Sequence, residues 1–424
     1  MKKIIALALA LVMTLALCAC GSSAAPAASS APAASSAPAA SEAPAANDAV
    51  AAVDELKVGF IFLHDENSTY DLNFLNGAKE ACANLGLKEG QFIYRTNIPE
   101  GQECYDAACE LADAGCNIIF ADSFGHEDYM IQAAKEFPEV QFCHATGTKA
   151  HTEGLSNYHN AFAAIYEGRY LAGVVAGLKL QEMIDKGEIT AEQAVIGYVG
   201  AFSFAEVISG FTSYYLGARS VCPSVTMKVQ FVGSWSNATE EANAASALCD
   251  LGCVLISQHS DNTTPATMAQ SKGAFHTGYN NDMTGVAPEA SLIGTRIDWS
   301  VYFTEIITAV VKGESFPQDW CKGMGDGAVV MTPLNEAICA EGTADKLAEV
   351  EAKIKDGSLN VFDTATFTIG GETLTTSFAL DTDGDFAPDS EEAVFDGVYH
   401  ESHFQSAPYF ALRIDGIEWL NEAY

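Results

Sequence analysis

The chain has 424 residues, with 56 acidic against 21 basic side chains and a formal net charge of −35. Hydrophobic residues make up 49% of it, which is enough for a packed core and excludes a disordered acidic chain. So acidic a surface repels nucleic-acid phosphates and anionic lipid headgroups, so we expect no nucleic-acid partner and no electrostatic membrane binding. The length fits two domains of ordinary size.

The first residues have the pattern of an export signal. Two lysines precede an apolar run from Ile4 to Ala19, which is shorter than the roughly 20 residues of a membrane span. We therefore predict a signal peptide over residues 1–19. The run ends Leu17-Cys18-Ala19-Cys20-Gly21, which resembles a bacterial lipobox and predicts that Cys20 is lipidated. The alternative is an ordinary secretory signal in which Cys20 is incidental.

A tether is expected next, over residues 20–54. Residues 25–48 consist of four hexads that each begin Ala-Pro-Ala-Ala. A proline in every hexad blocks a continuous helix, and the composition cannot form a core. Directly after a lipidated cysteine, such a segment would hold a folded body away from a membrane surface.

From residue 56 onwards, short apolar runs alternate with segments of helical spacing. Strands are expected at 58–62, 91–95, 117–121 and 139–144, and helices at 70–86, 101–114 and 127–136. After a long helix at 161–182, a second series has strands at 194–199, 226–232, 253–257 and 274–279, with helices at 204–218, 238–251 and 265–271. This alternation predicts an α/β fold of two lobes, each a doubly wound parallel sheet, joined by a hinge.

The last third predicts how the lobes are completed. A strand at 291–297 and a helix at 300–312 are expected to cross back to the first lobe. Residues 359–380 and 406–420 indicate an added β-hairpin and an edge strand. The expected lobes are residues 55–160 with 291–325, and residues 161–290 with 326–424, the second including the hairpin.

The loops after the strands should hold the function, because ligands of parallel sheets bind at the carboxyl ends of the strands. These loops are aromatic and acidic, and none of the five arginines after residue 19 lies in them. Such a site suits a flat, uncharged molecule rich in donors, and a nucleobase fits best. A sugar also stacks on tryptophan, so the residues alone leave it open.

Eight side chains are candidates for ligand contact, namely Tyr70, Asp71, Asp122, Phe204, Glu206, Trp235, Asp261 and Asp282. Most have a structural alternative. Trp235 could be a core aromatic, Tyr70 could only anchor its helix, and Phe202 competes with Phe204. The acids Asp122 and Glu206 could be helix-start residues, and Asp261 and Asp282 could be turn residues. His259 is expected to be a hydrogen-bonded interior histidine.

Catalytic and metal sites are not expected. The nine histidines show no zinc-protease spacing, and the chain has neither a nucleophile elbow nor a phosphate-binding loop. Residues 381–392 place acids as a calcium loop would, but Phe386 stands where glycine is needed, which favours a solvated acidic hairpin tip. We therefore predict no enzyme activity, no cofactor and no metal. The ten cysteines after residue 20 leave free thiols and one or two bridges equally open.

Several motifs, in order, resemble the BMP (basic membrane protein) family over residues 56–424. They are Tyr70-Asp71 with Asn76-Gly77, Ile165–Gly173, Gly233-Ser-Trp235, Gln258-His-x-Asp261, Gly278–Met283 and Ser406–Phe410. The resemblance implies a type I periplasmic-binding-protein fold. It also implies the substrate-binding component of an ABC importer for purine nucleosides or nucleobases, with permease and ATPase subunits as partners. The protein would then act, lipid-anchored, on the extracytoplasmic face of a bacterial membrane.

The resemblance also implies roles for individual residues. Tyr70 stands where the family has an aromatic after its first strand, and Asp122 matches an aspartate that grips the base. Phe204 or Trp235 would be the facing aromatic, and Asp282 or Asp261 would hold ribose.

This chain departs from the family where a lysine is common, because it reads Arg296-Ile-Asp298-Trp299 there. A bare nucleobase such as adenine therefore stays possible as the ligand. A lipid-anchored ligand sensor of the same fold and a sugar importer component are the alternative functions.

Overall fold

The computed structural model describes residues 53–380, 382 and 388–424, which belong to one compact unit. The predicted signal peptide, Cys20 and nearly all of the predicted tether lie outside the described residues. So does most of the acidic 381–392 loop. Among the described residues, no helix is both long enough and apolar enough to cross a membrane. Their ten cysteines are all free thiols.

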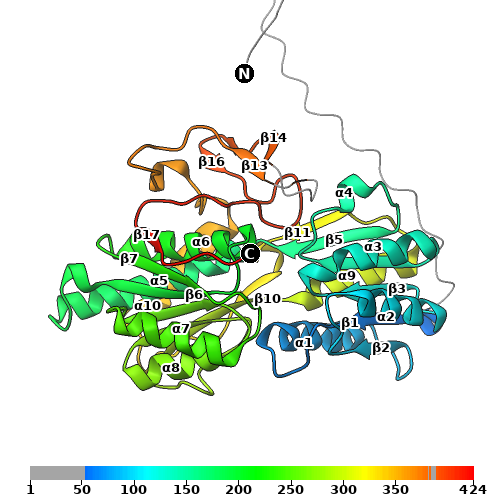
Figure 1. The fold of residues 1–424 in the computed structure, drawn as a ribbon, viewed down its shortest axis with the longest axis horizontal. Helices are drawn as coiled ribbons and strands as arrows, with labels where there is room; N and C mark the ends of the chain where they lie inside the picture. The colour runs from blue at the N-terminus through cyan, green and yellow to red at the C-terminus, as the bar shows by residue number, and fades with distance from the viewer. Residues whose placement is uncertain (1–52, 381, 383–387) are drawn as a thin grey trace, which may run out of the picture. The chain divides into compact units, whose positions relative to one another are not determined.

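Within the described residues, the first sheet has six strands, all parallel, in the order β11-β5-β4-β3-β1-β2 (Figure 1). Its strands are β1 (Val58–Ile61), β2 (Phe92–Arg95), β3 (Ile118–Ala121), β4 (Gln141–Ala145), β5 (Tyr158–Ala163) and β11 (Asp319–Lys322). Its helices are α1 (Thr69–Asn84), α2 (Gln102–Asp113), η2 (Phe124–His126), α3 (Glu127–Glu136), α4 (Ala150–Glu153) and α9 (Trp299–Lys312).

Helices cover both faces of this sheet because its strands are apolar on both sides. Phe60 and Phe120 pack with Phe303 of α9 in one hydrophobic cluster. Ile61 and Ile119, which are adjacent in sequence to Phe60 and Phe120, belong to a second cluster with α2 and α3. The side chains of successive strand residues point to opposite faces, so these strands are fully buried.

The second sheet has seven strands among the described residues, in the order β12-β10-β9-β8-β6-β7-β17, and only β12 is antiparallel to its neighbour. Its strands are β6 (Val195–Gly200), β7 (Thr226–Phe231), β8 (Leu255–His259), β9 (Phe275–Tyr279), β10 (Ser291–Ile297), β12 (Val329–Met331) and β17 (Ile417–Trp419). Its helices are α5 (Ile165–Asp185), α6 (Ala205–Val221), α7 (Ala238–Asp250), α8 (Thr264–Lys272) and α10 (Thr343–Lys355).

The remaining elements are short. They are the 3₁₀ helices η1 (Val53–Glu55), η3 (Ala191–Gln193), η4 (Met324–Asp326) and η5 (Thr364–Thr366), and the strands β13 (Phe378–Leu380), β14 (Pro388–Glu392), β15 (Val394–Phe395) and β16 (Val398–Tyr399). The two parallel sheets with their helices confirm the predicted α/β class.

Two expectations about strand placement were wrong. The long helix begins at Ile165, because residues 161–163 end β5, whose polar residues hide its strand character from the hydrophobic pattern. Strand β10 pairs with β9 in the second sheet instead of crossing back to the first. Gly278 and Gly294 are paired across these two strands, which allows their backbones to approach closely. The chain returns to the first sheet after β10, where α9 packs on α1 and β11 pairs with β5.

The C-terminal segment, defined here as residues 363–424, also differs from expectation. Tyr409 and Phe410 are fully buried and form no strand, because Phe410 stacks on Phe362 at 4.6 Å between ring centroids. The edge strand is β17, which pairs with β7. The predicted hairpin over 359–380 reduces to β13, which pairs with β14 beyond that range.

This segment touches both sheets (orange to red in Figure 1). The Ser406 amide donates to Oδ1 of Asp319 on β11 at 2.8 Å. The Ser203 amide, after β6, donates to the Ala423 carbonyl at 2.7 Å, and the Ala423 amide donates back to Oγ of Ser203 at 2.8 Å. The C-terminal segment therefore contacts the first sheet at β11 and the second sheet at the loop after β6.

Candidate functional site

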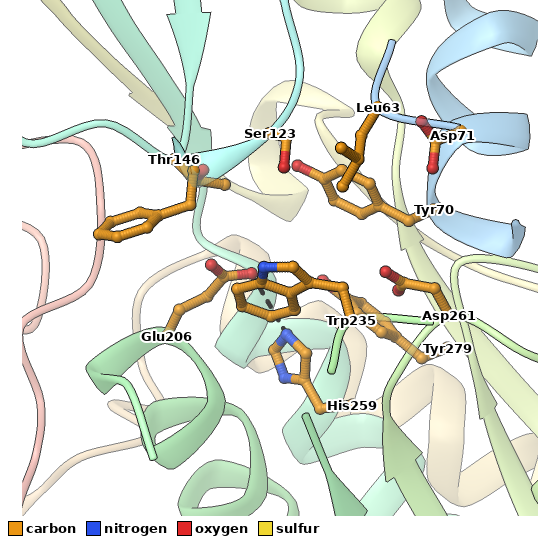
Figure 2. Close-up of a pocket in the computed structure, with 11 residues that line it drawn as sticks. Leu63, Tyr70, Asp71, Ser123, Thr146, Glu206, Trp235, His259, Asp261 and Tyr279 are labelled. Carbon is orange, nitrogen blue, oxygen red and sulfur yellow. Dashed lines mark hydrogen bonds and ion pairs between the residues drawn. The ribbon is translucent and has the colours of Figure 1, made fainter. Parts of the chain in front are cut away.

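A cavity lies where the carboxyl ends of strands from both sheets meet. Its volume is about 370 Å³, including its opening to solvent. The described residues that line it are Leu63, Tyr70, Asp71, Ser123, Phe124, Thr146, Glu206, Trp235, His259, Asp261 and Tyr279 (Figure 2). The first six follow strands of the first sheet, and the other five end or follow strands of the second.

Tyr70 forms the aromatic surface on the first-sheet side. It belongs to the first turn of α1, whose N-cap Ser68 accepts a hydrogen bond from the Asp71 amide. The Tyr70 hydroxyl donates to the Asp122 carbonyl at 2.6 Å, and its ring packs on Phe74 with centroids 4.9 Å apart. Both contacts hold the ring in one orientation.

Trp235 provides the aromatic surface on the second-sheet side, in the loop after β7. Its carbonyl accepts a hydrogen bond from the Asp261 amide at 2.9 Å. Phe202 contacts the indole edge to face at 5.1 Å and stacks on Phe204 at 5.1 Å. Figure 2 shows Tyr70 and Trp235 projecting into the cavity from opposite sides.

Two aspartates lie side by side on the first-sheet side. Burial alone would raise the pKa of Asp71, but hydrogen bonds from His64 and Ser68 outweigh it and lower the pKa. Burial, followed by the charge of Asp71, raises the pKa of Asp122 well above its usual range. Asp71 is therefore the more easily ionised member of the pair, and Asp122 holds a proton more readily.

The second-sheet side combines two acids with a neutral histidine. Burial raises the pKa of Glu206 to about 7, although the Arg169 guanidinium partly opposes the shift. Burial, and then the charge of Asp71, raises the pKa of Asp261 well above its usual range. Burial and Arg169 lower the pKa of His259, whose Nε2 lies 3.2 Å from Oε1 of Glu206.

Arg169 lies behind the cavity, on α5. Its guanidinium carbon is 3.4 Å from the centroid of the Tyr279 ring, and Nη1 donates to the Gln258 carbonyl at 2.9 Å. The residue is 1% exposed and does not line the cavity. It supplies a buried positive charge that supports Tyr279 by a cation–π contact.

Four cavity residues have buried polar atoms without a hydrogen-bond partner among the described residues: Oδ2 of Asp71, Oγ1 of Thr146, Nδ1 of His259 and the hydroxyl of Tyr279. Leaving such atoms unpaired costs about 1–3 kcal/mol each. A ligand that offers donors and acceptors would pair with them, so the cavity has the chemistry of a polar, ring-shaped guest.

The loops of the two sheets contact each other beside the cavity. The Thr69 amide donates to the Asp261 carbonyl at 3.0 Å. The rings of Phe124 and Phe204 lie 5.4 Å apart. The structure therefore encloses the cavity between both sets of loops.

Five of the eight candidate residues line the cavity: Tyr70, Asp71, Glu206, Trp235 and Asp261. Asp122 lies behind Tyr70, where its Oδ1 accepts from the Leu63 amide at 3.1 Å. Phe204 borders the cavity through its contacts with Phe124 and Phe202.

Asp282 requires a correction, because it is exposed and lies outside the cavity. Its Oδ1 accepts from the Thr284 amide at 2.9 Å, which closes a turn after β9. Asn280, with φ +62°, bends the chain before it. The side chain of Asp282 therefore serves the turn.

Six lining residues were not among the candidates: Leu63, Ser123, Phe124, Thr146, His259 and Tyr279. All except Tyr279 lie in or next to loops that the strand pattern had marked. His259 was expected to be a hydrogen-bonded interior histidine, and its bond to Glu206 belongs to the cavity wall. Tyr279 is the last residue of β9, and its position at the strand end is the signal that could have identified it.

Comparison with known proteins gives consistent relatives. A family model described as Bmp, ABC transporter substrate-binding protein PnrA-like, matches residues 61–362. A purine-binding protein of Brucella abortus is 36% identical over 313 residues, which are 73% of this chain and 83% of that protein. A Haloferax volcanii protein named as the ABC transporter glucose-binding protein TsgA13 is 31% identical, over 60% of this chain and 61% of its own length.

Among solved structures, an ABC transporter solute-binding protein of Conexibacter woesei has a TM-score of 0.58. It is 16% identical and is matched over 72% of this chain and 98% of its own. This likeness confirms the expected fold, the type I periplasmic-binding-protein fold.

Proposed function

The chain belongs to the Bmp family of PnrA-like ABC transporter substrate-binding proteins, and on this premise we propose that its cavity captures a purine base or nucleoside. The family is a solute-binding component of transporters that works outside the cytoplasm, so the chain binds its ligand without transforming it. The purine proposal rests on one observation: Tyr70 and Trp235 project into the same cavity from opposite sides.

The two aromatic surfaces suit a flat ring system. Stacking on an aromatic side chain contributes about 1–3 kcal/mol per nucleobase. Tyr70 is fixed by its bond to Asp122, and Trp235 is supported by Phe202, so little rotamer freedom is lost when a ring slides between them.

The acids would read the edge of the ring. Asp71, whose pKa is lowered, would accept from ring N–H groups or an exocyclic amine. Asp261, whose pKa is raised by burial, would accept when ionised and both donate and accept when protonated. Glu206 completes the acidic lining. None of the described lining residues is an arginine or lysine, so the ligand carries no phosphate.

The proposed ligand-contact residues are Tyr70, Asp71, Glu206, Trp235 and Asp261, supported by Asp122 and Phe204. Contacts to both sheets at once would stabilise the closed arrangement. This form would then dock on the permease and ATPase subunits of the importer.

The ligand class is tested by isothermal titration calorimetry on protein freed of co-purified ligand by partial unfolding and refolding. The panel consists of adenine, guanine, hypoxanthine, adenosine, inosine and glucose. We expect a purine to bind and glucose not to bind. Glucose is included because one relative is named for it, and binding of glucose alone would reject the purine proposal.

Trp235→Ala should weaken purine binding by about 1–3 kcal/mol, because it removes one stacking surface. Phe378→Ala is the matched control, since Phe378 is 53% exposed and does not line the cavity. The dissociation constants of both variants are compared with the unmodified protein. An affinity unchanged in Trp235→Ala would place the ligand elsewhere.

We further propose a lipid anchor on Cys20, supported by the lipobox-like sequence and the repeats that follow it. Replacing the thiol in Cys20→Ser leaves no sulfur for the thioether to lipid. The variant should therefore move from the membrane to the soluble fraction of expressing bacteria, as measured by immunoblotting. Unchanged membrane retention would contradict the anchor.

A further inference from the structure

A second cavity adjoins the proposed purine site. Its volume is about 1,100 Å³, including its opening to solvent. It shares Phe124, Thr146 and Glu206 with the first cavity. Three shared wall residues mean that a group attached to a ring in the first cavity can extend into the second without crossing a packed layer.

The second cavity has mainly apolar walls. Phe204 forms its border with the aromatic row that leads to Trp235. The C-terminal segment contributes the apolar residues Ala407, Pro408 and Ala411, and Leu380 on β13 adds a branched side chain. The other described lining residues are Thr148, Ser203, Ala205, Gln405 and Tyr424. The family match ends at residue 362, so this wall belongs to a part of the chain that the match does not include.

The chemistry of the walls limits what can occupy this space. Glu206 is the one carboxylate among the described lining residues, and they include no lysine or arginine. An anionic group would therefore be repelled. Thr148, Ser203 and Gln405 offer some polar atoms, but apolar side chains make up most of the wall surface. An uncharged apolar group would gain from burial here.

We propose that this second cavity, the substituent chamber, receives an alkyl or aryl group carried by the bound purine. The inference rests on the proposed function and adds to it the class of ligand, a purine with an apolar substituent. The ring would lie between Tyr70 and Trp235, and the substituent would pass Phe124 and Thr146 into the chamber.

The test compares adenine with two isomers, 6-benzylaminopurine and 9-benzyladenine, by isothermal titration calorimetry. Because burial of an aryl group adds hydrophobic free energy, one isomer should bind at least about tenfold more tightly than adenine. Two isomers are needed because the orientation of the bound purine decides whether its N6 or its N9 faces the chamber.

Variants that fill the chamber show whether the higher affinity of the benzyl isomer comes from binding in the chamber. Ala411→Phe should abolish the gain of the benzyl isomer while changing adenine affinity by less than about twofold, and Leu380→Phe repeats the test from another wall. Ala352→Phe, at an exposed position of α10, is the matched control and should keep the gain. Adenine binding shows that each variant is folded.

Three results would overturn the inference. If adenine binds and neither isomer binds more tightly, the chamber takes no substituent, and the proposed function stands without it. The same holds if the gain survives in both filled variants. If adenine and both isomers all fail to bind to the unmodified protein, the proposed function is itself wrong and the inference fails with it.

Discussion

Two buried glutamates in this molecule have pKa values that burial raises to near neutral pH. Burial raises the pKa of Glu401 to about 7, although hydroxyl groups of Ser209 and Ser402 donate to it. The residue is 3% exposed, on the C-terminal segment. Glu206, in the cavity wall, also has a pKa raised to about 7 by burial. Both acids therefore take up a proton on folding near neutral pH.

Glu401→Gln should make the free energy of unfolding less sensitive to pH. The folded-state pKa of Glu401 exceeds the unfolded value of 4.5, so folding is favoured at low pH and this contribution is lost as pH rises through 7. Between about pH 5 and pH 8 the unmodified protein should lose on the order of 2 kcal/mol relative to the variant. Urea unfolding at both pH values measures this.

Glu341→Gln is the matched control, because Glu341 is exposed. It should follow the pH dependence of the unmodified protein. If Glu401→Gln also follows it, Glu401 is ionised in the folded state and the pKa shift is wrong.

At the residue scale, the sequence identified the cavity through its strand ends. Trp235 and Asp261 could be predicted because each lies in a loop that follows a strand, and Tyr70 because it lies in the first turn of the helix after the first strand. Arg169 could not, since it lies within the long helix α5 and reaches Tyr279 only in the folded chain. Asp282 follows a strand as well, but its side chain accepts a hydrogen bond within a turn. That turn depends on backbone angles that the residue types alone did not indicate.

At the scale of elements, α5 and α6 pack closely through glycine. A Cβ added to Gly173 would lie 1.9 Å from the Tyr214 carbonyl oxygen, and one on Gly217 would lie 2.0 Å from that of Tyr170. Neither neighbour can move without bending a helix. The two helices thus depend on the absence of side chains at their crossing.

Gly173→Ala should destabilise the fold by about 1–3 kcal/mol or more, because the added methyl group forces the helices apart. Thermal unfolding should show a lower midpoint, by about 2–4 °C for each kcal/mol. Gly285→Ala is the control, since its Cβ would have no neighbour within 4 Å, and it should unfold as the unmodified protein does. An unchanged midpoint in Gly173→Ala would mean that the helices lie further apart.

Element types were easier to predict than element partners. The apolar runs of β1 and β3 are short but uninterrupted, so their strands were clear. The pairing of β10 with β9 depends on contacts across the sheet that no local pattern encodes. Similarly, Tyr409 has the sequence of a strand residue, but aromatic packing in the C-terminal segment outweighs β propensity there.

At the scale of the whole described body, ligand capture should couple the two sheets. The bond from the Thr69 amide to the Asp261 carbonyl joins a loop of the first sheet to one of the second. If a purine draws both sets of loops together, this bond forms more of the time in the complex than in the free protein.

Adding the purine that binds should therefore slow hydrogen exchange at the Thr69 amide, as measured by NMR or mass spectrometry. The Asn280 amide, which donates to Thr295 within the second sheet, is the internal control and should change little. Equal slowing at both amides would indicate general stabilisation without closure, and no slowing at Thr69 would contradict closure around the ligand.

The reciprocal bonds between Ala423 and Ser203 have a practical consequence for recombinant work. Tyr424 borders the substituent chamber, so an affinity tag or fluorescent protein fused after it would be attached beside the binding region. Purification handles are better placed ahead of Val53, where the described residues begin. Affinities measured with and without a C-terminal tag should be compared before any value is trusted.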